Sequence, residues 1–292
     1  MRANVPQYDV VAPPTLDEAL ALMAREPGVW TPLAGGTDLM VLFEAGKLPP
    51  GRYLSIWGLA ELAGITVSDD AVTLGALATY GEIRANAAIE ADLPMLVRAA
   101  RETGAIAIQN RGTIGGNIAN ASPAADSPPA LVAYDAELTL VSAAGTRTTP
   151  FRGFHTGYKR MDLRPGELVG SVRVPRRPAA DGWVHFYKKV GTRAFQAISK
   201  VGFAGCARVV DGVAREVRIG LASVAPTVLV ATHTEAALEG ASVSDPGLEA
   251  RAAQAMLQDV TAIDDIRSTA HYRTQVAANL ASAFVRALRE RG

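Results

Sequence analysis

The segment at residues 112–129 constrains the fold more than any other part of the chain. It is rich in Gly, Ala, Asn, Ser and Pro, and its apolar residues follow neither the helical nor the strand period. A long segment without periodicity inside a compact domain is usually either functional or disordered. Because this one carries almost no charge, we expect an ordered loop that lies against a ligand.

The sequence on either side of this loop predicts regular structure of two kinds. Residues up to about Ile56 read as strand, helix, strand, glycine-rich loop, helix and strand, which is typical of a small α/β unit. From Trp57 to Pro175 the pattern predicts strands at 72–76, 138–141 and 167–174 and a helix at 93–101.

A polar, proline-rich stretch at residues 175–182 is the best linker candidate. Beyond it, strand-like runs at 200–210 and 213–224 are joined by Asp211-Gly212, a strong hairpin signal, and helical patterns follow at 248–260 and 268–289. In the last helix an apolar stripe recurs every four residues and predicts packing on a sheet. Its members are Tyr272, Val276, Leu280, Phe284 and Leu288.

We therefore predict an α+β chain. Its first domain spans residues 1–176, with lobes of about 1–56 and 57–176, and its second domain spans residues 183–292.

Composition excludes several classes of protein. The 292 residues carry 29 basic and 29 acidic side chains, whereas a nucleic-acid or anionic-membrane binder needs a concentrated positive field. A single cysteine, Cys206, excludes an internal disulfide and a cysteine-ligated iron–sulfur or structural zinc site on this chain alone. We expect Cys206 to be a small core residue. Without an apolar N-terminal segment or a run of roughly 18 apolar residues, we expect a cytoplasmic protein.

Common catalytic patterns are absent. The chain has no Walker A motif, no strand-borne Gly-x-Gly-x-x-Gly and no Gly-x-Ser-x-Gly elbow. The four histidines (His155, His185, His233 and His271) lack the spacing of metal ligands, so we expect no metal site and no acid–base catalytic set.

A first candidate binding loop is Ala34-Gly35-Gly36-Thr37-Asp38, between a predicted strand and a predicted helix. Consecutive glycines let the backbone approach a ligand and turn successive N–H groups toward one point. At a helix N-terminus such donors suit a phosphate. The alternative is a tight strand–helix turn in which Asp38 is an ordinary N-cap.

A second candidate loop begins Thr113-Ile114-Gly115-Gly116-Asn117 and continues to Asp126. A second glycine pair, flanked by hydroxyl and amide groups, suggests a long ligand with phosphates at its centre. Asp126 is then suited to accept hydrogen bonds from a sugar hydroxyl. The alternative is an ordinary polar loop.

In this order and separation, the two loops resemble the flavin-binding subunit of the molybdenum hydroxylase family, which includes xanthine dehydrogenase, aldehyde oxidoreductases and carbon monoxide dehydrogenase. The resemblance covers nearly the whole chain. It implies a two-lobed FAD-binding domain of the vanillyl-alcohol oxidase (PCMH) type, followed by a C-terminal domain with an antiparallel sheet and helices.

The resemblance also implies roles for individual residues. Ala34 to Asp38 would surround the FAD pyrophosphate, with Thr113, Gly115, Gly116 and Asn117 as the opposing wall and Asp126 on a cofactor hydroxyl. Val169 matches a backbone contact near the isoalloxazine. Lys188, in Phe186-Tyr187-Lys188, matches a flavin contact that would stabilise the reduced anion.

Arg193 and Lys200 match basic residues near the flavin and the cluster-bearing partner, or else belong to a solvated strand edge. The residue in front of Ile198-Ser199 is uncharged here and often acidic in the family, which leaves the electron acceptor open.

The resemblance implies two partner subunits, a large one with molybdenum–pterin and a small one with [2Fe–2S] clusters. Electrons would run from molybdenum through the clusters to FAD and then to NAD, a quinone or oxygen. Two alternatives remain: a stand-alone flavin oxidase or reductase of the same fold with its own substrate pocket, and a non-catalytic binding protein whose glycine loops are only turns.

Overall fold

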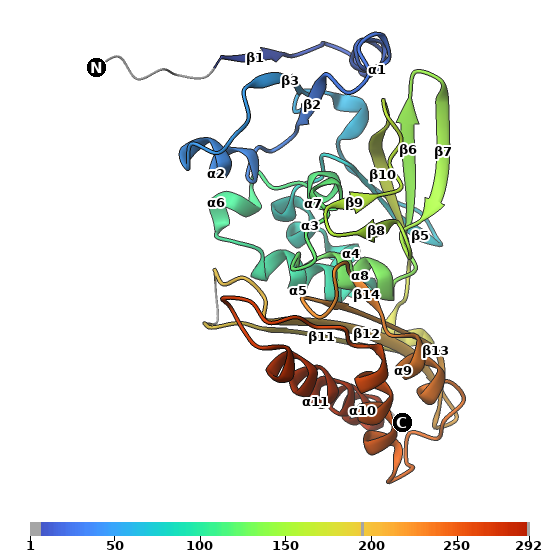
Figure 1. The fold of residues 1–292 in the computed structure, drawn as a ribbon. Coiled ribbons are helices and arrows are strands. Elements are labelled where there is room, and N and C mark those ends of the chain that lie inside the picture. Colours follow the sequence, from blue (N-terminus) through green and yellow to red (C-terminus); the bar gives the residue numbers. More distant parts are fainter. Residues whose placement is uncertain (1–6, 194–195, 291–292) are drawn as a thin grey trace.

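The computed structural model describes residues 7–193 and 196–290. Sheets of three, five and four strands follow one another along the molecule, from the N-terminal lobe at the top of Figure 1 to the C-terminal sheet and helices at the bottom. The predicted α+β architecture is confirmed. None of the helices in this part of the chain has the length and apolar character that crossing a bilayer requires.

The N-terminal lobe is the predicted small α/β unit. Its elements are β1 (Tyr8–Val11), α1 (Leu16–Arg25), β2 (Trp30–Leu33), α2 (Leu39–Glu44) and β3 (Gly51–Ser55). β3 lies between β1 and β2 and is parallel to both. Pro32 is on the edge strand β2, where its missing N–H costs no central ladder bond.

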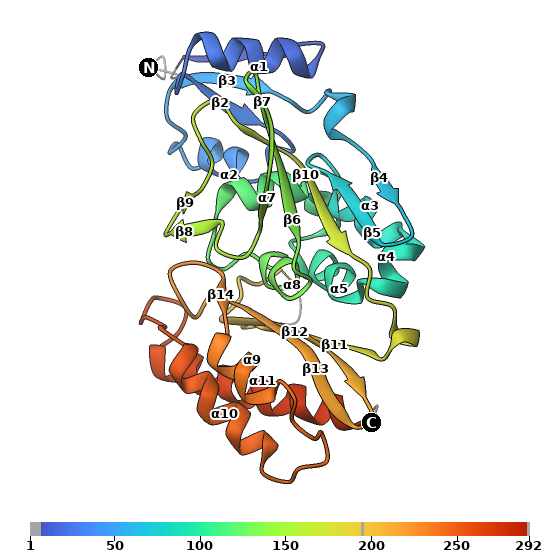
Figure 2. The same ribbon diagram turned by 90° about the vertical axis from the view of Figure 1, so that its right-hand side faces the viewer.

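The second lobe is a five-stranded antiparallel sheet in the order β4-β5-β10-β6-β7, covered by helices (Figure 2). Its strands are β4 (Ile65–Val67), β5 (Ala71–Gly75), β6 (Glu137–Ser142), β7 (Gly145–Pro150) and β10 (Leu168–Pro175), with the 3-10 helix Ala60–Leu62 before them. Its helices include α3 (Tyr80–Ala85), α4 (Ala87–Asp92), α5 (Pro94–Glu102) and α6 (Ile106–Gln109). A small hairpin, β8 (His155–Gly157) and β9 (Arg160–Met161), projects between β7 and β10 in sequence.

Our expectation of one irregular loop at residues 112–129 was wrong. The segment contains α7 (Ile114–Asn120), and α8 (Pro128–Ala133) begins at its end. Two glycines and two asparagines give α7 a poor helix propensity, so packing must form it. Ile114 and Ile118, one turn apart, are completely buried, and a Cβ on Gly115 would lie 2.6 Å from the Cβ of Ala76. Tertiary contacts thus override the local sequence.

The C-terminal part is a four-stranded antiparallel sheet with helices on one face. Its elements are β11 (Trp183–Val190), β12 (Val201–Val210), β13 (Val213–Ala222), β14 (Leu229–Val230), α9 (Thr232–Leu238), α10 (Leu248–Asp259) and α11 (Ala270–Arg289), and the 3-10 helix Ala179–Asp181 precedes them. The predicted hairpin at Asp211-Gly212 is present, with φ of 50° and 71° at the two turn residues.

The apolar stripe of α11 packs on this sheet as predicted. Phe284 lies 5.9 Å from Phe203, centroid to centroid, and both rings are completely buried. Tyr272 is the exception at the start of the helix: it is 40% exposed, and the Lys200 ammonium lies 5.1 Å from its ring centroid.

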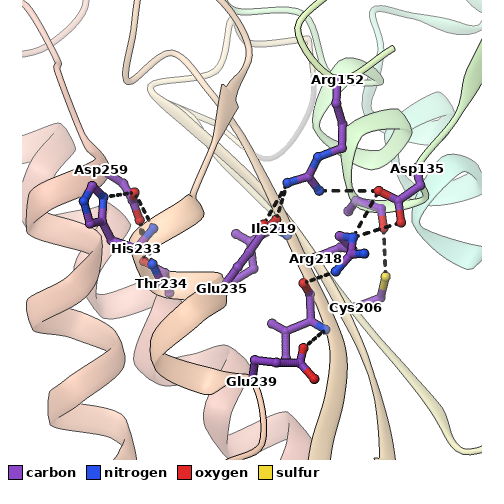
Figure 3. Close-up of polar contacts among 12 residues, drawn as sticks. Asp135, Arg152, Cys206, Arg218, Ile219, His233, Thr234, Glu235, Glu239 and Asp259 are labelled. Atoms are coloured by element: carbon purple, nitrogen blue, oxygen red, sulfur yellow. Dashed lines mark hydrogen bonds and ion pairs between the residues drawn. The ribbon is translucent and has the colours of Figure 1, made fainter. Parts of the chain in front are cut away.

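Polar contacts join the opposite face of this sheet to the second lobe (Figure 3). Asp135 accepts hydrogen bonds from Arg177 at 2.7 Å and Arg218 at 3.0 Å, and Arg152 bridges from Asp135 to Glu235. The Cys206 thiol is completely buried and donates to the Ala133 carbonyl at 3.0 Å, so Cys206 belongs to the core as predicted.

Candidate functional site

A cavity of about 500 Å³, here called the first cavity, lies between the N-terminal lobe and the second lobe. Its size suits a small-molecule ligand or cofactor. Most of the predicted binding residues line it: Ala34, Gly35, Gly36, Thr37, Asp38, Thr113, Gly115, Gly116, Asn117 and Val169. Sequence reasoning did not anticipate Ile56, Leu163 or Leu168, which add apolar surface from neighbouring segments.

The first glycine loop packs directly on the turn that leads into α7. A Cβ built on Gly35 would lie 1.6 Å from the Arg111 carbonyl oxygen, so no other residue fits there without movement. Gly36 has φ of +77°, in the left-handed region that favours glycine. The two glycine pairs, far apart in sequence, therefore meet at one cavity.

The first loop offers free backbone donors. Within residues 7–193 and 196–290, the N–H groups of Gly35 to Asp38 have no hydrogen-bond acceptor. The Gly36 carbonyl accepts a hydrogen bond from the Met40 N–H at 2.8 Å, and this bond begins α2. The N–H groups in front of Met40 therefore lie at the N-terminal, positive end of the helix dipole. This arrangement suits an anionic group such as a phosphate.

The second glycine pair differs, because its N–H groups are already bonded. The N–H groups of Ile114 and Gly115 donate to Ala78 and Ala76 at 3.0 and 2.9 Å, and that of Gly116 donates to Thr113 Oγ1 at 3.1 Å. This pair therefore provides a wall without side chains rather than a second set of backbone donors. The Asn117 side chain is held at the wall by Ser127, which donates to its Oδ1 at 2.7 Å.

A second cavity of about 480 Å³ adjoins the first, and Ile108 lines both. The structure places Asp126 in this second cavity rather than the first. Its carboxylate pairs with the Lys189 ammonium at 2.7 Å and accepts from the Ser199 hydroxyl at 2.7 Å. Burial raises the pKa of the Asp126 carboxyl above its ordinary value, although Lys189 acts in the opposite direction.

Lys188 lines neither cavity and is exposed. Side chains alternate along β11: Tyr187 is buried and bonds to the Asp126 backbone, so Lys189 shares the face of Asp126 and Lys188 does not. Lys189 is 7% exposed at its side chain and also donates to the Glu102 carbonyl at 2.8 Å. Sequence reasoning missed Lys189, although strand alternation could have distinguished the two lysines.

The other two basic candidates also lie outside both cavities. The Arg193 guanidinium donates to the Gln196 carbonyl at 2.6 Å, while Lys200 faces Tyr272 as described above.

Comparison with known proteins shows the family of this chain. Residues 6–177 match the FAD binding domain in molybdopterin dehydrogenase, and residues 185–288 match the CO dehydrogenase flavoprotein C-terminal domain. The xanthine dehydrogenase FAD-binding subunit of Escherichia coli O157:H7 is 32% identical over 89% of this chain and 88% of its own. The carbon monoxide dehydrogenase medium chain of Hydrogenophaga pseudoflava is 30% identical over 94% of each chain.

Solved structures agree with the sequence matches. A chain of carbon monoxide dehydrogenase from Hydrogenophaga pseudoflava superposes with a TM-score of 0.92 at 30% identity and covers 98% of both chains. A chain of the Cu,Mo-CO dehydrogenase superposes with a TM-score of 0.91 at 26% identity, over 99% of this chain and 100% of that one. This chain therefore belongs to the family of FAD-binding medium subunits of molybdenum hydroxylases.

Proposed function

We propose that this chain carries FAD between the [2Fe–2S] clusters of a small partner subunit and an external acceptor, in a complex whose large subunit holds molybdenum–pterin. The observation that carries the proposal is the pair of adjoining cavities, one with free backbone donors and the other with a buried lysine. The single cysteine supports the need for a partner, because one thiolate cannot ligate a [2Fe–2S] cluster.

The first cavity suits the diphosphate of FAD. The free N–H groups of residues 35–38 would hold the phosphate oxygens, while the bare surface of Gly116 lets the ligand lie close to α7. Several residues between Thr113 and Asn120 line the first cavity and several between Ser122 and Asp126 line the second, so an elongated ligand would run along this segment. Val169, on β10, would contact the ligand in the first cavity.

The second cavity suits the isoalloxazine, with the apolar side chains of Ile108 and Ile198 in its lining. FAD, when bound, supplies the electron-transfer chemistry, and the protein sets its binding, orientation and potential. We assign to Lys189 the role that the sequence suggested for Lys188, since a buried ammonium favours negative charge nearby. With both carboxylate oxygens of Asp126 bonded to Lys189 and Ser199, Asp126 would hold Lys189 in position.

The chain organisation supports a corresponding division. We infer an FAD-binding domain at residues 1–176 and a C-terminal domain at residues 183–292, because the two matched family domains end at 177 and begin at 185. Lys189 belongs to the second domain and Asp126 to the first, so their ion pair holds the second cavity together across the boundary.

Native purification tests the proposal. We expect a coloured complex, with both flavin and iron–sulfur absorbance, in which this chain co-elutes with one larger and one smaller chain and with flavin, molybdenum and iron in the same fractions. A colourless chain would refute FAD binding. A flavin-containing homo-oligomer that turns over without molybdenum or iron would instead support a stand-alone flavin enzyme.

A further inference from the structure

The tip of the β8–β9 hairpin reaches the end of α7 and connects it to the first glycine loop. Lys159 donates to the backbone carbonyl of Asn120 at 2.8 Å and also to its side-chain oxygen. The side-chain amide of Asn120 donates in turn to Asp38 Oδ1 at 3.1 Å. Asp38 and Asn120 both line the first cavity. Three distant segments are thus linked at its edge.

The chemistry of these three side chains permits one orientation of the amide. Lysine can only donate a hydrogen bond and an ionised carboxylate can only accept, so Asn120 must turn its oxygen to Lys159 and its NH₂ to Asp38. An amide held between a cation and an anion is polarised, which strengthens both of its hydrogen bonds.

The first loop has few other attachments on its C-terminal side. α2, which follows Asp38 directly, has no buried side chain, and Met40, Val41 and Phe43 are 48%, 62% and 48% exposed. A segment with so little buried apolar surface opens easily. The bond from Asn120 to Asp38 is therefore a main connection between this part of the loop and the second lobe.

The hairpin is a firm base for this connection. His155, in β8, is 7% exposed and its Nε2 lies 2.9 Å from the Ile118 carbonyl oxygen near the end of α7. Its ring packs at 5.2 Å, centroid to centroid, against the completely buried Phe151. Lys159 itself has a left-handed φ of 55° and an exposed side chain.

We propose that Lys159, Asn120 and Asp38 form a clasp that holds the first glycine loop against α7 and slows the release of FAD. Lys159 is a positioning residue in this scheme, because it donates both of these hydrogen bonds to Asn120 and acts on the cavity through that residue. The inference rests on the proposed function, because it requires FAD in the first cavity.

The test is the rate at which the purified complex releases FAD, followed by the fluorescence of free flavin after dilution. Lys159→Met and Asn120→Ala each remove two hydrogen bonds of the clasp, and each should accelerate release about 3- to 10-fold. Lys159→Arg should restore slow release. Arg160→Met, which removes a neighbouring exposed cation from the same hairpin, should release FAD at the wild-type rate.

A double variant separates the clasp from general damage. Because Lys159 acts through Asn120, Lys159→Met should add little to the release rate of Asn120→Ala. The clasp would be overturned if the effects of the two substitutions on the release rate were additive, or if both single variants released FAD at the wild-type rate. It would also be overturned if the two variants lost as much thermal stability without FAD as they lose with FAD bound. A wild-type complex without FAD would refute the proposed function instead, so the two failures are distinguishable.

Discussion

Gly35→Ala tests the contact that brings the two glycine loops together. The added Cβ would lie 1.6 Å from the Arg111 carbonyl oxygen, whereas a carbon and a carbonyl oxygen normally remain about 3.3–3.6 Å apart. Either the loop or the turn before α7 must therefore move by about 2 Å. That movement would displace the free N–H groups of the loop from the wall that faces them.

Overpacking of this kind costs about 1–3 kcal/mol of unfolding free energy, which for a chain of this size lowers Tm by several degrees. We expect Gly35→Ala to lose most of its FAD, measured as the flavin-to-protein absorbance ratio, and to melt at a lower temperature. Gly58→Ala is the matched control, because a Cβ on Gly58 meets no atom within 4 Å. Full FAD content and an unchanged Tm in Gly35→Ala would refute the reasoning.

Three further substitutions test other parts of the structure. In a spectroelectrochemical titration, Lys189→Met should lower the two-electron flavin potential by about 30 mV or more, and Lys188→Met should leave that potential unchanged. Equal shifts in the two variants would contradict the assignment of Lys189. Burial raises the pKa of the Cys206 thiol from 9.0 to about 11, so the folded chain binds that proton more tightly than the unfolded chain. The resulting contribution to the free energy of unfolding is complete below pH 9 and is lost as the pH rises toward 11. In denaturant titrations over this pH range, the free energy of unfolding should therefore decline less in Cys206→Ala than in the wild type. Asp135→Ala removes the carboxylate shared by Arg152, Arg218 and the buried Arg177, and should reduce the free energy of unfolding by about 2 kcal/mol. A loss below about 0.5 kcal/mol would show that this cluster of ion pairs contributes little.

Much of the fold was predictable because local signals and tertiary structure agree. The Asp211-Gly212 turn specifies its hairpin through backbone conformation alone, and the stripe through Phe284 specifies the face of α11 that is buried. α7 was not predictable in this way. Its glycines and asparagines oppose a helix, and the packing of Gly115 on Ala76 becomes visible only when β5 and α7 are placed together.

The candidate site was predictable to the same extent. The glycine loops could be singled out because consecutive small residues let a backbone approach a ligand, and both lie at the first cavity. The residues of the second cavity come from segments separated in sequence, so no local motif unites them. Lys188 and Lys189 show how a displacement by one residue along a strand moves a side chain to the opposite face of the sheet, and no local motif distinguishes the two lysines.

The two glycine pairs have the same letters and different physical roles. At Gly35-Gly36 the backbone N–H groups find no acceptor among the residues that the structure describes, so we expect this pair to hold a charged ligand directly. At Gly115-Gly116 the N–H groups are bonded within the second lobe, and a Cβ on Gly116 would lie 2.8 Å from Thr113 Oγ1, the atom that caps α7. The second pair is thus needed so that a capped helix can lie close to both Ala76 and the cavity. Affinity for the diphosphate should therefore depend on backbone donors from the N-terminal lobe, while the second lobe fixes how near the ligand can come. We therefore expect the connection between the lobes, through Gly35 and Arg111 on one side and through Asp38 and Asn120 on the other, to control binding.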